Sequence, residues 1–132
     1  MNPTPTYRYT IPLIPRSLNE YAGRRNTWEY RNDKSEWLRI IWACCREKPT
    51  KPLEKSIVTI EYHFPDNRRR DPDNYCGKMI LDGLVSCGII KDDSFGHVEL
   101  RLRGCVDKAN PRTEVTVEQS GQNENETGGE PQ

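Results

Sequence analysis

Alternating apolar and polar side chains predict four strands along the chain. The clearest strand covers residues 55–64, where every second side chain is apolar: Val58, Ile60, Tyr62 and Phe64. Residues 6–14 mix β-branched and aromatic side chains and predict a first strand, whose later part Pro12 turns into an edge or a loop. Shorter alternating runs around residues 98–102 and 115–117 predict a third and a fourth strand.

Two further stretches repeat apolar side chains at helical spacing. The first helix is predicted over about residues 28–47, with an apolar face formed by Trp37, Leu38, Ile41, Trp42 and Cys45. The second is predicted over about residues 74–87 and ends at Gly88. Its apolar face is formed by Ile80, Leu81, Leu84 and Val85. The resulting order β-α-β-α-β-β favours a small α+β domain, in which both main helices pack on one face of a mixed β-sheet.

The 132 residues suffice for one domain, which we expect over residues 1–119. Residues 120–132 contain no aliphatic or aromatic side chain and predict a disordered acidic tail. No apolar run approaches the roughly 18–20 residues of a membrane-spanning helix. The first residues also lack the basic and apolar segments of a secretion signal. We therefore expect a cytoplasmic protein without a membrane partner.

Charge is distributed unevenly, although 20 basic and 20 acidic residues give a formal net charge of zero. Residues 1–70 carry 14 Lys and Arg against 8 Asp and Glu, a net +6. Residues 71–119 carry 6 against 9, and the last 13 residues carry three glutamates and no base. A nucleic-acid partner is therefore compatible with the neutral sum, because a global sum hides the distribution.

The cysteines are poorly arranged for disulfides or for a zinc finger. They are Cys44, Cys45, Cys76, Cys87 and Cys105, an odd number that includes an adjacent pair. No C-x-x-C or Cys/His finger spacing occurs. We therefore expect reduced cysteines with a structural role.

The residues that suggest chemistry follow the strongest predicted strand. In chain order they are Arg68, Arg69, Arg70, Asp71, Asp73, Asn74, Lys78, Asp82, Asp92 and Asp93. Only Pro72 separates Asp71 from Asp73, and its ring restricts the backbone so that both carboxylates can aim at one point. We expect Asp92 and Asp93 to fold back toward the start of the second helix. Four carboxylates meeting there would repel one another unless a cation neutralised them.

Mg²⁺ is the expected cation, because it usually takes one or two carboxylates together with water and phosphate. Such a metal polarises a phosphoryl oxygen and lowers the pKa of a water nucleophile. Lys78, expected about one helical turn past Asn74, would present an ammonium group to the same phosphate. Arg68, Arg69 and Arg70 would hold the flanking phosphates. The pattern therefore predicts metal-dependent phosphodiester hydrolysis.

The stretch RRRDPDNYCGKMILDGLVSCGIIKDD, residues 68–93, resembles the RusA family of Holliday junction resolvases. The family signature is a basic residue, Asp-x-Asp-Asn, a lysine, a helical Asp, then Gly and an Asp-Asp pair. The resemblance implies a small α+β homodimer that uses Mg²⁺, with Mn²⁺ as a substitute, to nick four-way DNA junctions symmetrically. By element order it extends over residues 6–118.

By this resemblance, metal binding and catalysis fall to Asp71, Asp73 and Asp93, with Asp92 in support. Lys78 matches the active-site lysine of the family.

The resemblance also matches Arg70 to the basic residue before the first aspartate, and Asn74 and Asp82 to positions with a structural role. The segment between Asn74 and Lys78 is one residue longer than in the best-known members, so the position of Lys78 is open.

Structural interpretations compete with these assignments. Asp-Pro-Asp-Asn alone is ordinary turn and helix-capping chemistry. Asp71, Asp73 and Asp82 also fit positions 1, 3 and 12 of a calcium loop. Tyr75 and Cys76 occupy its positions 5 and 6, so we reject the calcium loop.

Several other residues are open between a structural and a functional role. Arg24 and Arg25, in a loop with Gly23, are either a second DNA contact or plain surface. His63 and His97 are interpreted as satisfied strand-face residues without a Cys or His partner close in sequence. Among the tryptophans, Trp28 is expected to be the most exposed and could stack on a base, whereas Trp37 and Trp42 fit core packing. Lys91 is a surface lysine by default.

The sequence therefore predicts a metal-dependent endonuclease acting on branched DNA. Two alternatives stay open: a DNA-binding module of the same fold that does not cut, and a metal-dependent hydrolase of smaller phosphate esters. The complete carboxylate set argues against the first, and the basic segments 16–31 and 68–70 argue against the second.

Overall fold

A computed structural model describes residues 4–21 and 27–121, and its element order confirms the predicted α+β domain. The elements are β1 (Thr6–Ile11), the 3₁₀ helix η1 (Leu18–Tyr21), α1 (Thr27–Cys44), β2 (Ser56–Phe64), the 3₁₀ helix η3 (Pro72–Asn74), α2 (Lys78–Ser86), β3 (Val98–Val106) and β4 (Arg112–Gln119). Arg24, Arg25 and most of the predicted tail, residues 122–132, lie outside the described residues.

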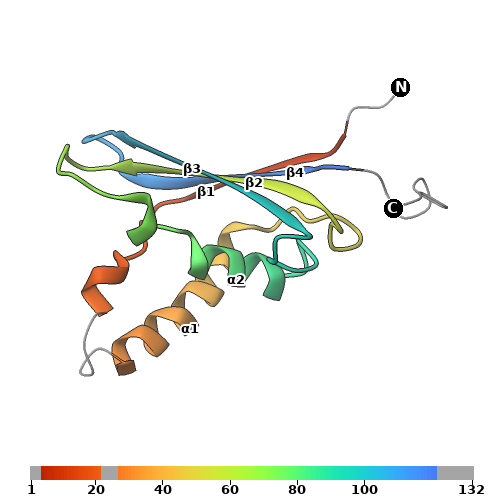
Figure 1. The fold of residues 1–132 in the computed structure, drawn as a ribbon, viewed down its shortest axis with the longest axis horizontal. Coiled ribbons are helices and arrows are strands. Elements are labelled where there is room, and N and C mark those ends of the chain that lie inside the picture. Colours follow the sequence, from red (N-terminus) through yellow and green to blue (C-terminus); the bar gives the residue numbers. More distant parts are fainter. Residues whose placement is uncertain (1–3, 22–26, 122–132) are drawn as a thin grey trace.

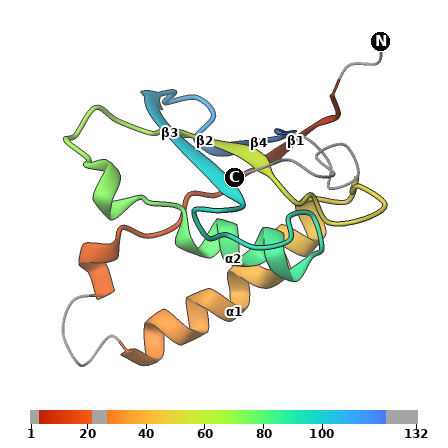
Figure 2. The same ribbon diagram turned by 45° about the vertical axis from the view of Figure 1, so that its right-hand side comes forward.

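The four strands form one mixed sheet in the order β1-β4-β2-β3. β4 pairs antiparallel with both β1 and β2, whereas β2 and β3 are parallel. Helix α2 is the crossover between the two parallel strands, as such a connection requires. Both main helices lie on one face of the sheet, as Figures 1 and 2 show from two directions.

The core lies between the sheet and the helices, and strand alternation forms it as predicted. In β2 the buried positions are Ser56, Val58, Ile60, Tyr62 and Phe64. In β4 they are Thr113, Val115 and Val117. The intervening side chains, including Glu61 and His63, are half-buried on the opposite face of the sheet. This polar face is therefore where β2 and β4 display their titratable groups.

The structure decides one open prediction and corrects another near the N-terminal side. β1 ends at Ile11, so the later part of residues 6–14, from Pro12 on, is a loop, which is one of the two outcomes predicted for it. Trp42 is not a core residue, because its side chain is 61% exposed and lies under the ammonium group of Lys48, 5.0 Å from the ring centre. Trp37 and Ile41 form the buried face of α1. Trp42 is one residue past Ile41, and a rotation of about 100° per residue turns it toward solvent.

The second helix begins at Lys78 and not near residue 74. Residues 72–74 form their own 3₁₀ turn, and Gly77 then has a φ of 80°, which is left-handed and ends any continuous helix. A Cβ at Gly77 would lie 2.5 Å from Cδ1 of Ile60, so the backbone approaches the sheet closely here. At the other end Gly88, with a φ of 80°, stops the helix as predicted.

All five cysteines are free, in agreement with the prediction. Cys45 is fully buried, and that burial raises the pKa of its thiol to about 12. Cys105 is exposed on β3, and the other three are half-buried. Within the described residues no helix is long and apolar enough to cross a bilayer.

Candidate functional site

The Asp-Pro-Asp turn lies where the chain has left the carboxyl end of β2. Asp71 occupies the N-cap position of η3, with extended backbone angles, yet its side chain makes no capping hydrogen bond. Its backbone carbonyl accepts a hydrogen bond from the Asn74 amide at 2.9 Å, so the turn closes through the main chain alone. Asp73 is exposed one residue beyond Pro72. The Asp71 carboxylate therefore takes no capping role in this turn.

Two arginines beside this turn are highly exposed. The Nε atom of Arg69 lies 3.1 Å from Oδ1 of Asp71, and the Arg69 side chain is 89% exposed. Arg68 pairs with Asp66 at 3.4 Å and is similarly exposed. Both guanidinium groups sit close to the Asp71 carboxylate along the chain and can reach a solvent-borne anion.

Arg70 has a different environment and anchors the loop. Its side chain is only 17% exposed and pairs with Asp66 at 2.9 Å. It donates further hydrogen bonds to the backbone carbonyls of Asp66 and Arg68, and its guanidinium lies 4.3 Å from the ring centre of Phe64. The predicted phosphate contact of Arg70 therefore competes with a full set of intramolecular contacts.

Lys78 does not follow Asn74 by one helical turn, because Tyr75 to Gly77 interrupt the helix. The ammonium group of Lys78 lies 3.6 Å from Oδ2 of Asp82, and Lys34 of α1 lies at the same distance from that oxygen. Asp82 therefore joins the two helices, in keeping with the structural role expected for it.

Asp92 and Asp93 lie at the opposite end of the sheet from Asp71 and Asp73. The backbone amide of Lys91 donates to the carbonyl of Leu53, just before β2 begins. Ser94 then accepts hydrogen bonds from the amides of His97 and Val98, at the start of β3. Ser56 and Val98 are register partners, whereas Asp71 lies beyond Phe64 at the far end of β2.

The expected return of Asp92 and Asp93 to the start of the second helix is therefore wrong within one chain. After α2 the chain runs on into the parallel strand β3, which must begin at the amino end of β2. Nine-residue β2 alone separates the two ends by about 26 Å. In the described part of the chain, no three of the four predicted carboxylates gather closely enough to share a metal ion.

Among the residues that the structure describes, one group of side chains could hold a metal ion, at a place where the sequence predicts none. It consists of Glu61 and His63 of β2 and Glu114 of β4, whose ligand atoms lie within 4.8 Å of one another. The alternation in β2 predicts that two of these three residues, Glu61 and His63, lie on one face of the sheet. Glu114 was missed, because the pairing of β2 with β4 joins residues 53 positions apart.

The two histidines differ in their surroundings. His97 has its Nδ1 atom 2.8 Å from the carbonyl oxygen of Glu54, so it is satisfied as expected. His63 was expected to lack a cysteine partner, but its Nδ1 atom lies 3.1 Å from the sulfur of Cys105 on β3. The parallel pairing of β2 with β3 creates this contact.

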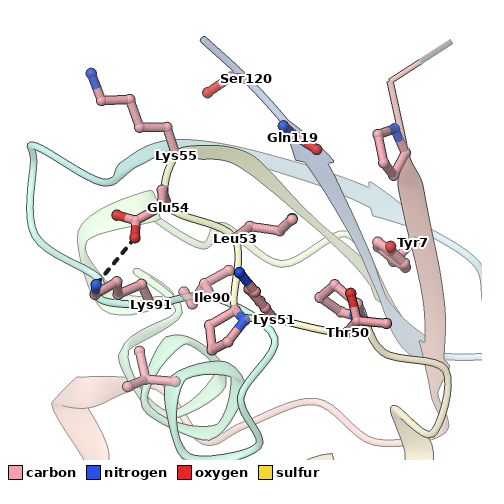
Figure 3. A pocket seen from close by; sticks show the side chains of 14 residues that line it. Tyr7, Thr50, Lys51, Leu53, Glu54, Lys55, Ile90, Lys91, Gln119 and Ser120 are labelled. Carbon is pink, nitrogen blue, oxygen red and sulfur yellow. Dashed lines mark hydrogen bonds and ion pairs between the residues drawn. The ribbon is translucent and has the colours of Figure 1, made fainter. Parts of the chain in front are cut away.

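A cavity of about 680 Å³ lies away from the Asp-Pro-Asp turn. Figure 3 shows its wall, where Lys51, Lys55 and Glu54 surround Leu53 at the amino end of β2. Lys91 pairs there with Glu54 at 3.1 Å, consistent with its interpretation as a surface residue. A much smaller cavity of about 80 Å³ is lined by Asp71 and by the rings of Phe64 and Tyr75, among others.

Neither a protein-family model nor a curated protein sequence matches the chain.

Proposed function

We propose that the protein is a Mg²⁺-dependent, structure-specific DNA endonuclease similar to the RusA resolvases, acting as a cytoplasmic homodimer on Holliday junctions. It would resolve a junction by paired symmetric nicks, in recombination and repair. The observation that carries the proposal is the uncapped Asp71 carboxylate. An aspartate at an N-cap position normally bonds to the first turn of its helix, whereas the Asp71 side chain pairs with the exposed Arg69 and stays 45% exposed, within reach of a metal ion.

Asp71 and Asp73 suit Mg²⁺ by their chemistry. They offer carboxylate oxygens from a proline-restricted turn, and Mg²⁺ needs only one or two such ligands besides water and phosphate. The ion, or Mn²⁺ in its place, would stabilise the charge that develops on the phosphate during hydrolysis. Asp92 and Asp93 do not fit the same site within one chain, so their part in it requires a second protomer.

The basic residues have separate tasks in this proposal. Arg68 and Arg69 are exposed beside the carboxylates and would neutralise the phosphates on either side of the scissile one. Arg70 would fix the loop from behind through Asp66. Lys78 would have to leave Asp82 before its ammonium group could meet a phosphate.

The size of the space beside Asp71 argues against a small phosphate ester as substrate. Pockets for small molecules typically measure about 300–1,000 Å³. The cavity lined by Asp71 measures about 80 Å³, and its mouth is open. Exposed carboxylates beside exposed arginines are better suited to a large substrate that covers them itself.

Cleavage of defined DNA substrates tests the proposal. The protein is incubated with Mg²⁺ and a synthetic four-way junction, a linear duplex or a nucleotide, and compared with Asp73→Asn. Paired nicks in the junction alone, lost in Asp73→Asn while binding persists, are expected. Glu99→Gln is the matched control, because Glu99 is an exposed carboxylate of β3 that pairs with Arg101.

Junction binding without cleavage in either Mg²⁺ or Mn²⁺ would favour the non-cutting DNA-binding module. Hydrolysis of the nucleotide, with the junction left intact, would favour the small-ester hydrolase. Binding should also weaken steeply as salt rises, because phosphate contacts release counterions.

A further inference from the structure

The polar face of the sheet carries two glutamates in direct opposition. Glu61 of β2 and Glu114 of β4 are register partners in the antiparallel pair. Like charges placed directly opposite one another destabilise a strand pair, so positive charge beside them is favourable. His63 lies two residues along β2 on the same face, with its side chain only 13% exposed.

The carboxylate oxygens divide between two kinds of partner. The Oε1 atoms of Glu61 and Glu114 lie 3.3 and 3.9 Å from Nε2 of His63. The Oε2 atoms face outward to arginines, with Glu61 3.7 Å from Arg103 and Glu114 2.6 Å from Arg112. Each glutamate is thus held by a hydrogen-bonding or charged partner on one oxygen, and presents the other to the imidazole.

Cys105 orients the imidazole from the other side. Its sulfur lies 3.1 Å from Nδ1 of His63, within reach of an Nδ1–H donor. With the proton on Nδ1, the lone pair of Nε2 points at carboxylate oxygens, which are acceptors only. In that tautomer three electron-rich atoms converge without a donor among them, and a metal cation would satisfy all three, whereas in the other tautomer Nε2–H donates to Glu61.

We propose that Glu61, His63 and Glu114 form a transition-metal site that is best suited to Zn²⁺. The bound ion would link β2 to β4. Zinc ligands at about 2.0–2.2 Å in a tetrahedral shell lie about 3.4 Å apart. The two measured separations, 3.3 and 3.9 Å, bracket that value. An imidazole nitrogen among the ligands favours zinc over Mg²⁺, which prefers oxygen alone. Cys105, Arg103 and Arg112 would be the outer partners that orient the ligands.

Zinc binding by the full reduced chain tests the site. The protein is titrated against Zn²⁺ in competition with a chromophoric chelator, and its melting temperature is measured with and without the metal. One zinc per chain and a raised melting temperature are expected, because the ion binds only the folded site. Both effects should disappear in His63→Gln and in Glu114→Gln. Cys105→Ser should bind about 10–100-fold more weakly.

Three control variants separate this site from other carboxylates. Glu99→Gln, Asp71→Asn and Asp73→Asn should bind zinc like the unaltered chain, whether or not the protein is a nuclease. Circular dichroism without metal checks that His63→Gln and Glu114→Gln are folded. The proposal is overturned if the unaltered chain takes up no zinc, if folded His63→Gln or Glu114→Gln binds it equally, or if Mg²⁺ competes at similar concentration.

Discussion

Arg69 and Arg70 are neighbours in the sequence, but their side chains are 89% and 17% exposed. Arg70 holds Asp66, two carbonyl groups and the face of Phe64, whereas Arg69 contacts only the exposed Asp71 among the described side chains. Arginine therefore faces solvent at position 69 and stabilises the loop at position 70.

We expect Arg70→Ala to destabilise the protein by roughly 1–3 kcal/mol, because it breaks a half-buried hydrogen-bonding network. Arg69→Ala should change stability by less than about 0.5 kcal/mol. Under the proposed function, Arg69→Ala should instead weaken junction binding and lower its dependence on salt. Urea denaturation and binding assays at several salt concentrations measure both effects. Equal losses of stability in the two variants would contradict this division.

Asp66 should make the stability of the protein sensitive to acid. The backbone N–H of Arg68 donates to its carboxylate, which holds the pKa of Asp66 below its usual range, with help from Arg70. A depressed folded pKa contributes stability above the unfolded value of about 3.9, and the contribution is lost as pH falls through the folded pKa.

The free energy of unfolding should therefore fall below about pH 4 more steeply in the unaltered chain than in Asp66→Asn, which cannot titrate at this position. Urea denaturation at a series of pH values tests this. Parallel pH profiles for the two proteins would show that Asp66 contributes nothing.

Candidate site residues could be singled out from the sequence, but their arrangement could not. Asp71 and Asp73 could be found because a proline between two aspartates is a local signal. The anchoring role of Arg70 depends on Phe64 and Asp66, and three consecutive arginines look alike until the loop is folded. Glu114 could not be joined to His63, because no local pattern encodes which strands pair.

At the scale of elements, the close contact between the two helices depends on one glycine. A Cβ at Gly83 of α2 would lie 2.6 Å from Cγ1 of Ile41 in α1, and Ile41 is fully buried. Alanine improves helix propensity by about 1 kcal/mol over glycine, but overpacking a core costs about 1–3 kcal/mol.

We therefore expect Gly83→Ala to lower stability despite its better propensity. In an Ile41→Ala background the cost should shrink, since Cγ1 at 2.6 Å and Cγ2 at 3.1 Å are removed while only Cβ at 2.8 Å remains, and a double-mutant cycle by urea denaturation measures that coupling. Gly96→Ala is the control, because nothing lies within 4 Å of a Cβ there. A stabilised Gly83→Ala would show that the helices separate at no cost.

Strand alternation and helical spacing predicted the elements because they are local, and the exceptions have causes that a local pattern does not contain. The second helix lost its first turn because Gly77 packs against Ile60, a contact between two elements. The helical pattern groups Trp42 with the apolar face of α1, although its side chain faces solvent.

At the scale of the whole molecule, the two ends of the sheet hold the two halves of the predicted carboxylate set. If both halves serve one active site, Asp73 of one protomer must act with Asp93 of another. Asp73→Asn and Asp93→Asn should then each be inactive alone, yet regain cleavage when mixed.

The mixed dimer would contain one site with both substitutions and one site with neither, so it should nick a single strand. The two proteins are mixed under conditions that exchange subunits, and nicks are mapped on a labelled junction. If the mixture stays inactive although heterodimers form, each site lies within one chain, and if Asp93→Asn cleaves on its own, the site does not need Asp93.

The strand order also governs when this domain can fold during synthesis. β4 is made last, yet it lies between β1 and β2 and supplies the only strand partner of β1 in the described sheet. Joining β1 to β4 closes a loop of roughly 100 residues, at an entropic cost that begins at about 4 kcal/mol. A nascent chain that has not yet released residues 112–119 from the ribosome cannot assemble the sheet. The domain therefore folds only once nearly all of it has been made.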